Sequence, residues 1–159
     1  MDFSKQSVAF FTILKKEIKR ILRIWLQTLL PPVITMTLYF VVFGQMIGSR
    51  IGEMGGVSYM QFIVPGLIMM AVITNSYSNV LSSFFSMKFQ GSIEELLVSP
   101  LSKHTILLGY VGGGVFRGIV IALLVTIVAQ FFTQLAVVNL GVMLMTILGT
   151  SVLFSIGGL

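Results

Sequence analysis

Cysteine is absent from this sequence, histidine occurs once, and charged residues are scarce. The absence of cysteine excludes disulfides, thiolate metal sites and cysteine nucleophiles. His104 cannot form a metal site without carboxylate partners close by, so we expect no metal. The sequence also contains no paired carboxylates and no nucleophile beside a base, so we expect no catalytic residue. Few functions remain for such a chain other than those carried out by packed apolar helices.

Apolar residues make up 56% of the chain and charged residues 9%, whereas about 25% of an ordinary globular domain is charged. The mean hydropathy is +1.02. Since a membrane span uses roughly 20 residues, the long apolar runs predict four spans, at about 29–47, 60–86, 105–132 and 135–159. The predicted fold class is therefore all-α, a polytopic transmembrane helical bundle. Because the last run is apolar to the final residue, we favour a fragment that is incomplete at its C-terminus over a helix that simply ends there.

Residues 1–28 are predicted to form a cytoplasmic, interfacial amphipathic helix ahead of the membrane domain at 29–159. Within 8–25, cations fall in one arc of the helix and apolar side chains in the opposite arc, which is typical of a helix lying in the lipid interface. The alternative is a solvated helix packed on a soluble core. Pro31 and Pro32 predict a bend before the first span. The residues assigned to the lipid interface are Lys15, Lys16, Lys19, Arg20, Arg23 and Trp25.

Lys and Arg beside the spans set the orientation. They cluster in the N-terminal flank and recur as Lys88 and Lys103, whereas the 48–58 loop has only Arg50. We therefore expect the N-terminus and the 88–103 segment to be cytoplasmic. The basic cluster indicates a membrane surface, and no aromatic or base-edge readers accompany it, so we expect no nucleic-acid partner.

A short capped helix is predicted at 92–98, between the second and third spans. Ser92 followed by Glu95 is a capping box, and Pro100 ends the helix. Ile93, Leu96 and Leu97 form an apolar patch on this helix, which either lies on the bilayer or inserts into a groove of another protein. Since two Glu beside anionic lipid are unfavourable, we favour a protein partner. The candidate residues are Ser92, Ile93, Glu94, Glu95, Leu96 and Leu97.

The glycines of the third span form two small-x-x-x-small pairs, which let helix backbones approach closely in lipid. These helix-packing residues are Gly109, Gly113, Gly114 and Gly118. A phosphate-binding loop is excluded, because Val115 and Phe116 stand where that loop needs Lys and Ser or Thr.

Polar side chains follow one face of the second span and either line a translocation path or form interhelical hydrogen bonds. An intramembrane charge in the third span, Arg117, belongs to the same possible path. It either contacts an anionic headgroup, a substrate or a carboxylate, or snorkels to the surface from a partly unwound, glycine-rich helix start. The residues of this possible path are Asn75, Asn79, Ser82, Ser86 and Arg117.

Taken together, these stretches resemble the transmembrane permease of type-2 ABC transporters, the bacterial inner-membrane exporter permeases. The resemblance rests on residues 23–40, on Phe62-Ile-Val-Pro-Gly-Leu67 and on Ile93-Glu-Glu-Leu-Leu97 before Pro100. It implies six spans in the full permease, of which this chain has four. It also implies that residues 8–25 are a connecting helix and that 92–98 are a coupling helix that docks on a separate ATPase.

The resemblance implies a permease subunit that moves an unidentified substrate across the inner membrane while a partner ATP-binding-cassette subunit hydrolyses ATP. The chain itself is then no enzyme and holds no cofactor, since ATP and Mg belong to the partner. Two permeases are expected to pair as a homodimer. The alternatives are a self-contained carrier or a non-transporting scaffold. A carrier usually has internal repeats or several intramembrane charges, and here only Arg117 qualifies.

Overall fold

A computed structural model describes residues 3–92, 94, 98–99, 101–133 and 139–159. The described part is helical apart from one hairpin of two-residue strands, which confirms the all-α fold class. In chain order the elements are α1 (Phe3–Arg23), α2 (Trp25–Tyr39), the π-helix η1 (Phe40–Ile47), α3 (Gly48–Ile51), β1 (Glu53–Met54), β2 (Val57–Ser58), α4 (Tyr59–Phe89), α6 (Lys103–Phe132) and α7 (Leu140–Gly157).

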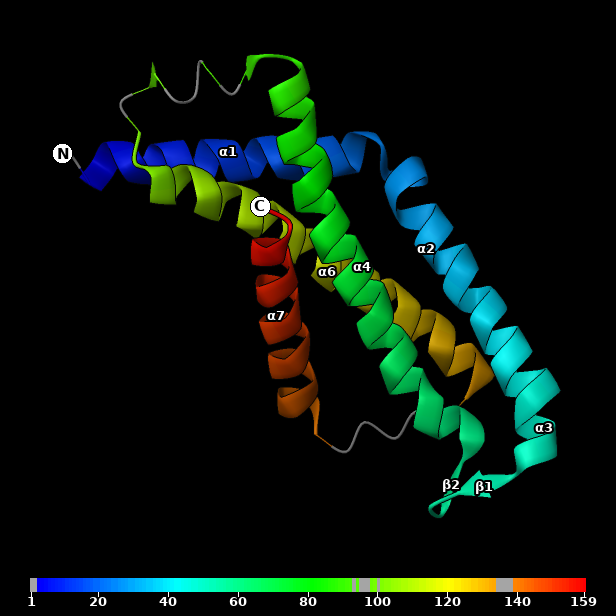
Figure 1. The fold of residues 1–159 in the computed structure, drawn as a ribbon. Helices are drawn as coiled ribbons and strands as arrows, with labels where there is room; N and C mark the ends of the chain where they lie inside the picture. Colours follow the sequence, from blue (N-terminus) through cyan, green and yellow to red (C-terminus); the bar gives the residue numbers. More distant parts are fainter. Residues whose placement is uncertain (1–2, 93, 95–97, 100, 134–138) are drawn as a thin grey trace.

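The long helices form an up-and-down bundle with α1 lying across one end (Figure 1). α2 runs away from α1, α4 returns, α6 runs away again behind α4, and α7 comes back. The connection from α4 to α6 therefore lies at the α1 end, together with the C-terminus. The hairpin lies at the opposite end.

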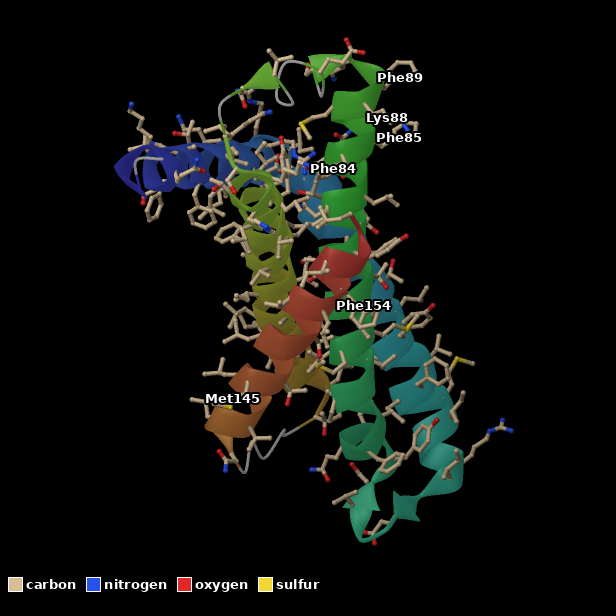
Figure 2. All side chains as sticks on the ribbon, turned by 60° about the vertical axis from the view of Figure 1, so that its left-hand side comes forward. Phe84, Phe85, Lys88, Phe89, Met145 and Phe154 are labelled. Atoms are coloured by element: carbon tan, nitrogen blue, oxygen red, sulfur yellow. The ribbon has the colours of Figure 1, made fainter. Side chains whose placement is uncertain are left out.

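Within the described residues, four helical segments are long and apolar enough to cross a membrane: Trp25–Gly44, Tyr59–Phe89, Lys103–Phe132 and Leu140–Gly157. Many of their large apolar side chains point outward, which suits contact with lipid. Figure 2 shows Phe85 and Phe89 projecting from the end of α4, and Met145 and Phe154 from α7. Phe89 is 85% exposed and Met145 is 79% exposed.

The bend after α1 lies at Ile24, so the prediction that Pro31 and Pro32 mark it was wrong. Both prolines lie inside α2. A proline inside a helix removes one backbone hydrogen bond, but neighbouring helices in a membrane protein can satisfy the freed carbonyl. The contact that does so here is described below.

The 48–58 segment is more ordered than the polar loop expected from sequence. Glu53 pairs with Ser58 across an antiparallel hairpin, and its turn uses Gly55 and Gly56, both with positive φ. Ser58 then caps α4: its side chain accepts a hydrogen bond from the backbone N–H of Gln61, and the Gln61 side chain accepts one from the Ser58 N–H. This capping box fixes where α4 begins.

The larger apolar core lies between α2, η1, α4 and α6, where Phe40, Val64, Val72, Ile121 and Val125 are each fully buried. A smaller apolar cluster lies between α1, α4 and α6, around Ile13, Val80, Met87 and Tyr110. Between the two clusters, buried side chains of α4 become polar.

Candidate functional site

α1 has three faces rather than the two predicted. Ile13, Glu17 and Ile21, spaced four residues apart, are buried against the bundle. Part of the predicted apolar arc stays exposed, and Trp25, just beyond the bend, is 52% exposed. The cationic arc forms the third face. The helix is therefore docked on the other helices while leaving an apolar edge free for lipid.

Glycines of α6 make room for α1. A Cβ built on Gly109 would lie 2.6 Å from Cγ2 of Ile13, and one built on Gly113 would lie 2.7 Å from Cβ of Glu17. Close approach of this kind is what small residues allow in lipid. The other predicted pair, Gly114 and Gly118, faces α4 and α7 instead, so the two pairs serve different neighbours.

Glu17 is a carboxylate that is only 2% exposed, and it joins α1 to α4. Its Oε2 lies 2.9 Å from Nη2 of Arg20 and accepts a hydrogen bond of 2.6 Å from the Ser83 hydroxyl. The same Nη2 donates to the Asn79 side-chain oxygen at 3.1 Å and to its backbone carbonyl at 3.3 Å. A buried charge needs a partner and hydrogen bonds of this kind.

Arg117 joins α2, α4 and α6. Its Nη2 donates to the Asn75 side-chain oxygen and to the Thr28 carbonyl, each at 3.0 Å. In a regular helix that carbonyl would accept from the amide four residues on, but this residue is Pro32, which has no N–H. The proline therefore leaves free the acceptor that Arg117 uses. α6 is continuous through its glycines, so the partly unwound helix start considered for Arg117 was wrong.

The structure brings together only part of the predicted polar face of α4. Asn75 and Asn79 are buried at 5% and 1% exposure. Ser82 and Ser86 are exposed, and the Ser82 hydroxyl donates back to the Asn79 carbonyl at 3.0 Å. Toward the C-terminal end of α4, the polar face therefore points away from the other helices.

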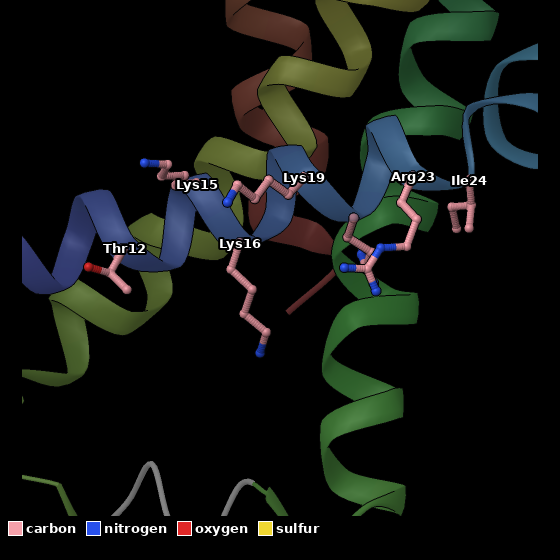
Figure 3. Close-up of a pocket in the computed structure, with 7 residues that line it drawn as sticks. Thr12, Lys15, Lys16, Lys19, Arg23 and Ile24 are labelled. Atoms are coloured by element: carbon pink, nitrogen blue, oxygen red, sulfur yellow. The ribbon is translucent and has the colours of Figure 1, made fainter.

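The five cations of α1 between Lys15 and Arg23 line a hollow of about 860 Å³. Figure 3 shows Lys16 and Arg23 reaching from α1 to the same side of the helix. Apart from Arg20, these cations are exposed and make no ion pair with the described residues. The hollow is lined by Thr12, Lys15, Lys16, Lys19, Arg20, Arg23 and Ile24.

The predicted coupling helix lies mostly outside the described residues. Ser92 and Glu94 are helical, and Glu94 is exposed. Ile93, Glu95, Leu96 and Leu97 are not among the described residues. Among those that are, no three His, Cys, Asp or Glu side chains lie close enough together to hold a metal ion.

The profile of the ABC-2 type transporter family matches residues 8–159. The chain belongs to the ABC-2 type transporter family. It is 60% identical over 152 residues to the inner membrane transport permease YadH of Escherichia coli K12, and equally so to that of E. coli O157:H7 and of Shigella flexneri. These alignments cover 96% of this chain and 59% of each relative, so the chain spans little more than half the length of those relatives. No solved structure matches the chain.

Three features of this site were missed by the sequence analysis, and each had a signal. Glu17 stands three residues before Arg20, at the edge of the cationic arc. Pro32 stands four residues after Thr28 and so marks a carbonyl without its helical donor. The capping box at Ser58 follows the Ser-x-x-Gln pattern.

Proposed function

We propose that this chain is the membrane-spanning part of an ABC exporter permease. It moves a substrate across the bacterial inner membrane while a separate ATP-binding-cassette subunit hydrolyses ATP. Membership of the ABC-2 type transporter family over residues 8–159 is the observation that carries the proposal. Four segments able to span a membrane and relatives named as inner membrane transport permeases support it. ATP and Mg bind the partner subunit, and the chain catalyses no reaction itself.

The working exporter is a pair of permeases with a pair of ATPases. The N-terminus lies in the cytoplasm, and α1 lies in the inner lipid interface with its cations toward phosphate groups. Its exposed apolar edge, which includes Phe11 at 65% exposure, supports this placement. The α4–α6 connection lies at the same end of the bundle as α1, where a cytoplasmic ATPase can reach both (Figure 1).

Force from the ATPase enters through residues 92–98 and passes to α4 and α6 together. At this end of the bundle, α4 contacts its neighbouring helices in two ways. One is direct packing on α6, and the other is the set of polar contacts that Glu17 and Arg20 make with Asn79 and Ser83. A push on the connection therefore moves α1, α4 and α6 as one body. Nucleotide then biases the transporter between two arrangements of such bodies.

Co-purification of the ATPase tests the coupling helix. Replacing Leu96→Asp and Leu97→Asp puts two charges into the apolar patch, and we expect the ATPase to be lost from the purified complex. The control is Val57→Asp, which adds one such charge at an exposed position of β2, at the far end of the bundle. If the doubly substituted protein retains as much ATPase as the control, the coupling-helix assignment is wrong.

The absence of cysteine makes the orientation directly testable. A single cysteine introduced as Glu94→Cys is expected to react with a membrane-impermeant maleimide only in inverted vesicles. One introduced as Val57→Cys is expected to react only from the outside of intact cells. The opposite pattern would refute the cytoplasmic placement of the α4–α6 connection.

A further inference from the structure

A pocket of about 390 Å³ lies between α1 and the α4–α6 connection. The polar side chains that line this inner pocket include Thr12 and Lys16 of α1 and Ser92 and Ser99 of the connection. Thr12 and Lys16 also line the larger hollow on the cationic face of α1, so the two spaces are neighbours along this helix. Figure 1 shows the last turns of α4 extending past α1 on the side away from the spans. In the proposed orientation, the inner pocket therefore lies at the cytoplasmic end of the bundle.

Contacts between the helices hold the walls of the inner pocket in place. The side-chain oxygen of Gln6 in α1 accepts from the backbone N–H of Ser102 at 3.3 Å and from the Thr105 hydroxyl at 2.5 Å. Ser102 makes no side-chain cap of its own at the start of α6, so α1 supplies it. At the other wall, the Tyr110 hydroxyl donates to Sδ of Met87 at 2.6 Å and joins α6 to α4. The pocket is therefore formed before any ligand enters, and its volume is within the range of roughly 300–1,000 Å³ that is usual for small-molecule sites.

The lining of the inner pocket suits a small anion. Among the described residues that line it, Lys16 carries the only charge at neutral pH. A lysine binds phosphate as a point charge, and the hydroxyls of Ser92 and Ser99 can donate hydrogen bonds to it. Ile13 and Leu101 add apolar surface, which suits a short carbon skeleton.

The neighbouring hollow favours a ligand with more than one negative charge. It adds Lys15, Lys19, Arg20 and Arg23 to the positive charge of Lys16. Arg20 is paired with the buried Glu17, and the other three cations have no ion pair in the described part of the chain. A phosphate monoester carries a charge of about −1.5 to −2 at pH 7, whereas a carboxylate carries a single charge. The positive potential of the hollow therefore attracts the phosphate more strongly.

We propose that the inner pocket binds a phosphate ester of a small organic group and that Lys16 recognises its charge. The phosphate lies between Lys16 and the hydroxyls of Ser92 and Ser99, so the ligand joins α1 to the connection. The organic part lies against Ile13 and Leu101. Because the ATPase is proposed to dock on the same connection, the ligand regulates that docking. This regulatory role rests on the proposed function, whereas the binding itself does not.

Protection of a single cysteine tests the binding. Leu101→Cys places one cysteine in the lining of the inner pocket, because the chain has no other. With the purified protein in a non-ionic detergent, glycerol 3-phosphate is expected to slow alkylation of this cysteine by a maleimide. The concentration that gives half of the full protection measures the affinity. Glycerol lacks the phosphate and is expected not to protect. Absence of protection by glycerol 3-phosphate, or equal protection by glycerol, would overturn the proposal.

Substitution of Lys16 tests its role in the same Leu101→Cys background. Lys16→Gln is expected to weaken protection by glycerol 3-phosphate about tenfold, the loss of roughly one charge-assisted hydrogen bond. The matched control Lys19→Gln removes the same charge from the same face of α1, but Lys19 lines the outer hollow and not the inner pocket. We therefore expect the control to keep most of the affinity.

Lys16→Arg separates loss of charge from misfolding. It keeps the positive charge, so we expect it to recover most of the affinity that Lys16→Gln loses. Equal losses in Lys16→Gln and Lys19→Gln would refute Lys16 as the recognising residue, and so would equal losses in Lys16→Gln and Lys16→Arg.

A second probe identifies the source of the phosphate ester. Dihexanoyl phosphatidic acid has the same phosphate on the same glycerol but carries two acyl chains. Comparable protection by the two compounds supports a soluble ester of the cytoplasm as the ligand. Protection by the lipid at far lower concentrations supports the same pocket with a lipid of the inner leaflet as its ligand.

The affinity of the ATPase for the permease tests the regulatory role. Because coupling between two binding sites is reciprocal, saturating glycerol 3-phosphate is expected to change that affinity by at least about fivefold. Lys16→Gln is expected to abolish the change. An ATPase affinity that is the same with and without the ligand would overturn the regulatory role. The protection measurements use the permease alone, so the phosphate site can fail while the ATPase still co-purifies, and the reverse also holds.

Discussion

The glycine surface of α6 yields a prediction whose sign can be worked out from the structure. A Cβ at Gly114 would lie 2.7 Å from Cγ2 of Val80 and 3.0 Å from the backbone carbonyl oxygen of Ser76, and it would also collide with the Ser155 hydroxyl. A hydroxyl can rotate away, but a backbone oxygen cannot, so α4 and α6 must separate. Because a rigid backbone atom is one of the contacts, the overpacking cost lies in the upper part of the usual range, at about 2–3 kcal/mol. Alanine recovers up to about 1 kcal/mol through its higher helix propensity, which leaves Gly114→Ala destabilised by about 1–2 kcal/mol.

The assay is thermal unfolding in detergent, followed by loss of the monodisperse peak after heating. A net cost of 1–2 kcal/mol lowers the apparent Tm by roughly 3–6 °C for a protein of about this size. Gly149→Ala is the matched control, because it makes the same substitution inside α7 where nothing lies within 4 Å. That control gains helix propensity without a collision and is expected to melt about 2–4 °C higher. If both variants shift in the same direction by similar amounts, α6 does not pack against α4 as described.

Two other substitutions test the buried polar contacts that Glu17 and Arg117 make. Removing one partner of a fully buried ion pair costs about 3–5 kcal/mol. Since Arg20 is 32% exposed, we expect Glu17→Gln to cost only about 2 kcal/mol. The measurement is the apparent Tm, which should be lower for Glu17→Gln than for Glu53→Gln, the control at an exposed position. Equal melting of these two variants would contradict the buried pair. In a double-mutant cycle, Pro32→Ala restores an amide for the carbonyl that Arg117 holds, so Arg117→Gln is expected to cost about 1 kcal/mol less in that background. Pro31→Ala is the control and is expected to leave the cost of Arg117→Gln unchanged.

Apolar periodicity predicted the helices well, because burial in lipid depends mainly on the length and composition of each run. The second and third spans were expected at 60–86 and 105–132, and the helices that cover those residues are Tyr59–Phe89 and Lys103–Phe132. The first span begins at Trp25 rather than near residue 29, because α2 includes both prolines. The expectation that the two prolines interrupt the helix was wrong, because a neighbouring helix in a membrane protein can satisfy the carbonyl that a proline leaves free.

The candidate site was predicted as residue types but not as pairs. Asn75 and Arg117 were both singled out from the sequence, yet their contact depends on how α4 and α6 rotate about their own axes. Neither helix sets that rotation alone. It follows from the glycines of α6, which draw α1 to one side and α4 with α7 to the other. Glu17 was missed for the same reason, because its burial depends on the shape of a helix far away in the sequence.

The missing amide of Pro32 also limits how the bundle can move. If Arg117 left the Thr28 carbonyl during transport, that oxygen would lose its donor, and no helical amide could replace it, which costs about 1–3 kcal/mol for a buried acceptor. The first and third spans must therefore tilt together near this level of the membrane. Any hinge between them has to lie farther along, toward the wide turns of η1.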